Sequence, residues 1–80
     1  MQPYKNLSKT DAHVSEYEIG DDHIIIKFTK PGRSGFNTYK YSYNSAGKDN
    51  VETMKQLAEA GEGLRTFVND QLRKMYESRS

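Results

Sequence analysis

The chain has 80 residues, no cysteine and a formal net charge of +1, so we expect one small domain, and both a disulfide framework and a thiolate metal site are excluded. Its longest apolar run is Ile24-Ile25-Ile26, which is too short for a membrane span, and we therefore expect a cytoplasmic protein. Leu, Ile, Val and Phe are scarce, so several of the six tyrosines are needed to supply buried apolar surface.

Charged residues are segregated along the chain. Residues 11–22 carry five acids and no base, whereas residues 23–48 carry five bases and no acid. Such an order either places unlike charges on neighbouring strands or creates a surface of one sign. The sequence leaves both outcomes open.

The N-terminal half is predicted to form a β-hairpin after a flexible lead-in. Residues 1–12 lack apolar periodicity, as is typical of a mobile chain end. Residues 13–20 form the first strand, which alternates between Ser15, Tyr17 and Ile19 on one face and Val14, Glu16 and Glu18 on the other. Residues 23–30 form the second strand, whose apolar face carries Ile24, Ile26 and Phe28.

The turn of this hairpin has two candidates, Gly20-Asp21 and Asp21-Asp22. With Asp21-Asp22 as the turn, apolar residues face apolar residues and an acid faces a base, in the pairs Ile19–Ile24, Tyr17–Ile26 and Glu16–Lys27. With Gly20-Asp21 as the turn, the two faces stay the same and only the partners change.

The third predicted strand, residues 36–43, contains three alternating tyrosines. A loop over residues 31–34 places Tyr39 opposite Ile26 and Tyr41 opposite Ile24. We therefore expect Tyr39 and Tyr41 to pack beneath the helices with their hydroxyls near the rim. For Tyr43, at the strand end, packing beneath the helices and exposure to solvent are both left open.

Two helices are predicted to follow. Asp49 and Glu52 have the spacing of a capping box at the start of the first helix, and Gly61-Glu62-Gly63 ends it. The second helix carries one apolar stripe, formed by Leu64, Phe67, Val68, Leu72 and Met75. The expected fold class is α+β, a three-stranded antiparallel β-meander followed by two helices packed on one face (β-β-β-α-α). The single domain spans residues 13–77, and residues 78–80 form a C-terminal tail.

The order of these motifs resembles the KTSC domain family, small domains found at the C-terminus of some lysyl-tRNA synthetases and as stand-alone bacterial proteins. The resemblance covers about residues 14–72. It is carried by the apolar strand 24–28, by Tyr39-Lys40-Tyr41, and by Gly63 followed by Phe67 and Asn69. The chain departs from the family because Val68 separates the aromatic residue from the asparagine, and because residues 44–48 replace a proline-bearing link. The resemblance implies no established activity, although association with a synthetase suggests RNA binding.

Basic residues interleaved with aromatic rings are typical of nucleic-acid surfaces, because cations neutralise phosphates while rings stack on bases. The candidate residues are Lys27, Arg33 and Lys40 for phosphate contacts, and Phe36, Tyr39, Tyr41 and Tyr43 for stacking. Stacking by the tyrosines requires their own face to be open. Otherwise the reverse face, with Ile25, Phe36 and the two strand lysines, is the binding surface. The sequence does not decide which sheet face is exposed.

The alternative is a protein-interaction or self-association module that uses an unpaired edge of the first or third strand. An enzyme is not expected, because no nucleophile, base and orienting group stand at a motif spacing. No metal or cofactor is expected either. His13 and His23 lie near opposite ends of the predicted hairpin, and the acidic turn lacks the ligand spacing of a calcium loop.

Overall fold

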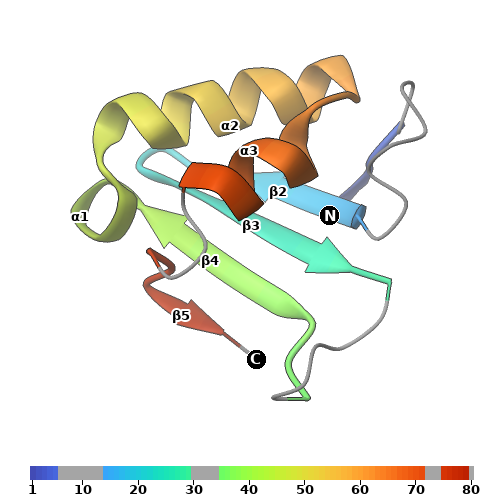
Figure 1. Cartoon of the computed structure of the whole chain (residues 1–80), viewed down its shortest axis with the longest axis horizontal. Helices are drawn as coiled ribbons and strands as arrows, with labels where there is room; N and C mark the ends of the chain where they lie inside the picture. Colours follow the sequence, from blue (N-terminus) through green and yellow to red (C-terminus); the bar gives the residue numbers. More distant parts are fainter. Residues whose placement is uncertain (6–13, 30–34, 72–74, 80) are drawn as a thin grey trace.

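The computed structural model describes residues 1–5, 14–29, 35–71 and 75–79. In that part of the chain, five strands form one antiparallel sheet in chain order, and helices cover one of its faces (Figure 1). The strands are β1 (Gln2–Pro3), β2 (Val14–Ile19), β3 (His23–Phe28), β4 (Thr38–Ser42) and β5 (Ser78–Arg79). The helices are α1 (Tyr43–Ala46), α2 (Lys48–Ala60) and α3 (Leu64–Gln71). The mixed α and β class is therefore confirmed.

The central meander has the predicted register. Ile19 pairs with Ile24, Tyr17 with Ile26 and Glu16 with Lys27, which selects Asp21-Asp22 as the turn. On the other side of β3, Ile24 pairs with Tyr41 and Ile26 with Tyr39. A β-bulge between Val14 and Glu16 shifts the start of β2 by one residue. Val14, predicted on the polar face, is buried for this reason.

Two short strands lie at the edges of the sheet where the sequence predicted none. Gln2–Pro3, within the predicted lead-in, pairs with β2, and Ser78–Arg79, within the predicted tail, pairs with β4. Tyr4 anchors the first of these segments, because its side chain is buried in the core and its hydroxyl accepts a hydrogen bond from the Leu64 N–H (3.4 Å). Residues 6–13 lie outside the described part.

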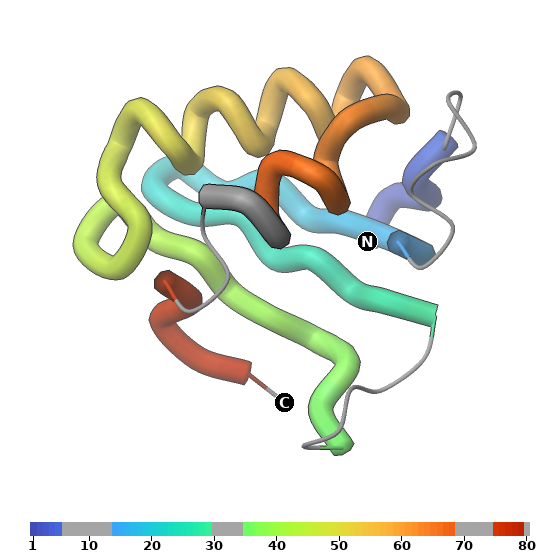
Figure 2. The backbone as a smooth tube through the Cα atoms, in the orientation of Figure 1, coloured from blue at the N-terminus to red at the C-terminus, as the bar shows by residue number. Residues whose placement is uncertain are grey.

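The third strand is shorter than predicted because a capping serine ends it. The Ser45 N–H donates to the Ser42 hydroxyl (3.2 Å), and the Ser42 N–H donates to the Ser45 hydroxyl (3.0 Å). This capping box starts α1 at Tyr43, so Tyr43 belongs to a helix and not to the strand. Figure 2 shows the change of direction from β4 through α1 into α2.

The predicted Asp49 cap of the next helix is wrong. Gly47, with φ of 92°, is the N-terminal cap of α2, and Asp49 lies inside its first turn. The C-terminal end agrees with the prediction, because Gly61 adopts the left-handed conformation (φ 77°) and its N–H donates to the Leu57 carbonyl (2.9 Å). Met75, predicted on the apolar stripe of α3, lies beyond that helix and is exposed; Leu72 lies outside the described part.

The core lies between the helices and the inward face of the central strands. Its most deeply buried large side chains are Ile24, Ile26, Tyr41, Val51, Met54 and Leu64. Tyr4 and Tyr17 are also buried, which confirms that tyrosines supplement the scarce aliphatic residues. Each fully buried aliphatic side chain contributes about 1.5–3 kcal/mol to the free energy of folding.

Adjacent isoleucines of β3 should differ sharply in their contribution to stability. Ile26 is fully buried, whereas Ile25 lies on the opposite face and is half-buried. We expect Ile26→Val to lower the free energy of unfolding by about 1 kcal/mol, and the matched Ile25→Val to lower it by well under ~0.5 kcal/mol. Urea denaturation followed by circular dichroism measures both. Equal losses would contradict the assignment of faces.

Candidate functional site

The seven candidate residues from the sequence do not form one surface. Tyr39 and Tyr41 point toward the helices, whereas Lys27 and Lys40 lie on the reverse side of the sheet, which we call the open face. Tyr41 is only 2% exposed, and burial raises the pKa of its hydroxyl well above the usual range. Arg33 lies outside the described residues. Tyr39 and Tyr41 therefore lie on the opposite face of the sheet from Lys27 and Lys40.

Both lysines of the open face have acidic partners. Lys27 Nζ lies 3.9 Å from Glu16 Oε1 on β2, and Lys40 Nζ lies 3.2 Å from Glu77 Oε2, just before β5. Segregated charge along the sequence thus places unlike charges on neighbouring strands. The open face carries both signs of charge. It therefore attracts phosphate less strongly than a purely basic surface would.

Tyr43 is engaged in a contact between α1 and α2. Its hydroxyl donates to Glu52 Oε2 (2.8 Å), and this hydrogen bond raises the pKa of Tyr43. Lys55 Nζ lies 2.8 Å from the same oxygen and 5.4 Å from the centre of the Tyr43 ring. The bond to Lys55, followed by that to Tyr43, lowers the pKa of Glu52. Tyr43 is half-buried, and its hydrogen bond to Glu52 fixes the position of its ring.

Phe36 and Tyr39 belong to an aromatic cluster at the β4–β5 side of the sheet, together with Phe28 and Tyr76. The Tyr39 ring meets Phe28 edge-on at 5.7 Å and Tyr76 at 5.3 Å between ring centres. The Arg79 guanidinium lies 4.7 Å from the centre of Phe36 and 5.3 Å from that of Tyr76. Arg79 pairs with Tyr39 and therefore shares its face of the sheet. The contact with Arg79 places the Phe36 ring on that same side, so the prediction of Phe36 on the reverse face is wrong.

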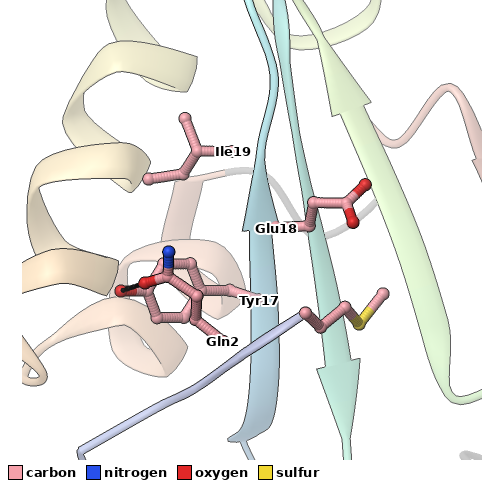
Figure 3. A pocket seen from close by; sticks show the side chains of 5 residues that line it. Gln2, Tyr17, Glu18 and Ile19 are labelled. Atoms are coloured by element: carbon pink, nitrogen blue, oxygen red, sulfur yellow. Dashed lines mark hydrogen bonds between the residues drawn. The ribbon is translucent and has the colours of Figure 1, made fainter.

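A hollow of about 290 Å³ lies at the edge of β2. Its lining residues, which define the β2-edge hollow, are Met1, Gln2, Tyr17, Glu18 and Ile19. Figure 3 shows that Gln2, Tyr17 and Ile19 project to one side of β2 and Glu18 to the other. The Tyr17 hydroxyl donates to Gln2 Oε1 (3.2 Å). Because the lining comes from both faces, the hollow lies at the strand edge, in line with β1.

The backbone of Ile19 faces this hollow. The Gly20 N–H donates to the His23 carbonyl (3.0 Å), so the backbone groups of Gly20 point toward β3 and those of Ile19 point away from it. The pairing of β1 with β2 ends at Gln2–Tyr17. The N–H and the C=O of Ile19 therefore lie just beyond the end of the ladder, at the outer edge of the sheet.

Apolar side chains are exposed at the same place. Among the described residues, the large hydrophobic side chains with substantial exposure are Met1 (50%), Ile19 (38%) and Met75 (46%). Two of these three line the β2-edge hollow. The sequence predicted an unpaired edge of the first strand but not that β1 covers part of it, because Gln2 and Pro3 stood in the predicted lead-in.

Acidic side chains predominate around the hollow, which also contains the α-amino group of Met1. Glu18 lies in its lining, and Asp21 and Asp22 form the adjacent turn. Asp22 Oδ1 lies 3.1 Å from His23 Nδ1, and this contact lowers the pKa of Asp22. Lys55 Nζ donates to the Asp21 carbonyl (3.2 Å) and so binds the turn to α2. Glu18 itself has no ion-pair partner in the described part of the chain.

Other kinds of site find little support in the described residues. No group of three or more His, Asp or Glu side chains there is placed to hold a metal ion. In the same part of the chain no helix is long and apolar enough to span a membrane. Searches among protein-family models, curated proteins and solved structures found no match to this chain. The KTSC resemblance therefore stays a prediction.

The ion pair between Glu77 and Lys40 should make the attachment of the β5 segment depend on pH. The Ser42 hydroxyl, followed by Lys40, lowers the pKa of Glu77. A lowered carboxyl pKa stabilises the folded state above the unfolded value of about 4.3, and this contribution disappears as the pH falls through the folded value. We expect Glu77→Gln to shift the urea midpoint downward at neutral pH and to leave it unchanged in strong acid.

Glu62→Gln, at an exposed position in the turn between α2 and α3, is the matched control. It removes the same charge and should not reproduce this pH-dependent difference. A Glu77→Gln midpoint equal to that of the unmodified protein at every pH would show that the ion pair contributes nothing.

Proposed function

We propose that this protein is a non-enzymatic protein-binding module that accepts an extended segment of a partner at the β2-edge hollow. The observation that carries the proposal is the combination of the outward backbone groups of Ile19 with the exposed side chains of Met1 and Ile19. An added strand satisfies the backbone groups, and its side chains cover the apolar surface. The segment would continue the line of β1.

The neighbouring edge of β1 supports this choice of position. Gln2 is paired with Tyr17, so its backbone groups point toward β2. The backbone of the next residue, Pro3, then points outward. Because proline has no N–H, the outer edge of β1 offers an added strand fewer hydrogen bonds than Ile19 offers. The opening beside Ile19 is therefore the better place for pairing.

The affinity for a short segment should be modest. Ile19 offers two backbone hydrogen bonds, each with a net contribution of about 1 kcal/mol, and covering the exposed parts of Met1 and Ile19 adds a similar amount. The cost of association offsets most of these gains, so a short peptide should bind with a dissociation constant above about 1 mM. Weak binding of this kind suits a module that acts together with further contacts.

Single-stranded nucleic acid is less well supported as the partner than an extended protein segment. The stacking candidates Tyr39 and Tyr41 lie on the opposite face from Lys27 and Lys40. Both of these lysines are ion-paired. The reducing cytoplasm remains our proposed compartment, because the chain contains no cysteine. The KTSC assignment is likewise still a proposal, and it neither favours nor excludes strand addition.

Peptide titration with amide chemical-shift mapping tests the proposed function. The probe is the neutral pentapeptide Ac-Gln-Val-Gln-Val-Gln-NH2, which can extend and carries no charge. We expect the largest shifts at Glu18, Ile19 and Gly20. Ile19→Pro removes the outward N–H and leaves the pairing with β3 intact, so binding should weaken about fivefold.

Ile19→Val is the matched control, because it shortens the same side chain and keeps the N–H; its affinity should stay close to that of the unmodified protein. Each variant is first checked for an unchanged amide spectrum away from β2. A short oligouridylate is titrated in parallel. Shifts caused by the RNA at Phe36 and Arg79, with none caused by any peptide, would reject the proposed function in favour of nucleic-acid binding.

A further inference from the structure

We infer that the partner segment carries a lysine or arginine directly beside the apolar residue that pairs with Ile19. This inference rests on the proposed function and specifies the chemistry of the ligand. Three features carry it: the alternation of side chains along an added strand, the unpaired carboxylate of Glu18, and the acidic turn next to it.

Strand geometry decides which side chains of the ligand meet which residues. In an antiparallel pair, residues directly opposite share a face of the sheet. The ligand residue opposite Ile19 therefore projects to the helix side, where Figure 3 shows the side chains of Ile19 and Tyr17. An apolar residue suits that position. The neighbouring ligand residue, opposite Gly20, projects to the open face, the side to which Glu18 points.

Glu18 is within reach of a long side chain at that position. The residue opposite Gly20 is a diagonal neighbour of Glu18, and diagonal neighbours lie about 7–8 Å apart, close enough for long side chains to meet. The flexible stem of a lysine or arginine can lie over the apolar lining of the hollow while its charge reaches the carboxylate. Met1 supplies part of that lining.

The carboxylate of Glu18 has no competing cation in the described part of the chain. Glu16, Glu52 and Glu77 each contact a lysine, and Asp22 contacts His23. Among the described residues, no contact of this kind involves Glu18. A cation at the hollow can therefore reach Glu18 without displacing a partner from it.

The same charges disfavour a second copy of this chain as the occupant. Two copies paired with each other at Ile19 would bring the Glu18 carboxylates of both copies onto one face as diagonal neighbours, and like charges on facing strands are destabilising. A basic segment from another protein replaces this repulsion with attraction. The occupant is therefore a partner whose extended segment alternates basic and apolar residues.

A charge series of one peptide tests the inference. The probes are Ac-Lys-Val-Lys-Val-Lys-NH2, the neutral glutamine peptide described above, and the glutamate equivalent. At low salt we expect the lysine peptide to bind about two- to fivefold more tightly than the neutral peptide, and the glutamate peptide to bind more weakly. High salt should reduce the differences, because exposed charges are screened.

Glu18→Gln should abolish the preference for lysine and leave affinity for the neutral peptide unchanged. The control Glu62→Gln removes the same charge far along the chain and should retain the preference. If no peptide of the series shifts the Ile19 amide, the proposed function itself fails. If the neutral peptide binds there and lysine brings no gain, or Glu18→Gln keeps the gain, only the inference about charge fails. A dimer joined through β2, detected by sedimentation at low salt, would also overturn it.

Discussion

The register of β3 against its two neighbours decides what every other part of the structure can do. Ile24 and Ile26 are opposite Ile19 and Tyr17 on one side and opposite Tyr41 and Tyr39 on the other. A slip of one residue would carry this apolar set to the open face and turn the lysines inward. The position of the helices, the ion pairs of the open face and the outward backbone of Ile19 all depend on this alignment.

Tyrosine links the core of this small domain to its margins. Tyr17 is buried, and its hydroxyl reaches Gln2 at the β2-edge hollow, while Tyr4 joins the β1 segment to the start of α3. In both cases the ring supplies buried apolar area and the hydroxyl forms a hydrogen bond to another segment of the chain. A chain with few aliphatic residues thereby holds short strands that could not be stable alone.

Local patterns predicted the meander and missed its ends. Alternation over residues 23–30 predicted which side chains share a face. Facing apolar pairs favoured Asp21-Asp22 as the turn, although Gly20-Asp21 stayed open until the structure selected the register. The two-residue strands β1 and β5 are too short to produce a period, and they form because Tyr4 and the ring contacts of Arg79 hold them against the sheet. Ser42 and Ser45 contain the signal that ends β4, although serine in place of the usual glutamate or glutamine makes that capping box hard to recognise. Neighbouring residues of a strand point to opposite faces of the sheet. A stretch that is rich in both basic and aromatic residues therefore need not form one surface.

Pro3 has a consequence for stoichiometry. A sheet that adds a strand at one edge usually acquires a new edge as good as the one it covered, so growth can continue toward a fibre. Here the outward position of β1 is a proline, and the segment accepted beside Ile19 would be in line with it. After binding, the outer edge of the sheet would therefore still lack a backbone donor at Pro3. The geometry favours complexes of one module with one segment, in which binding ends the growth of the sheet.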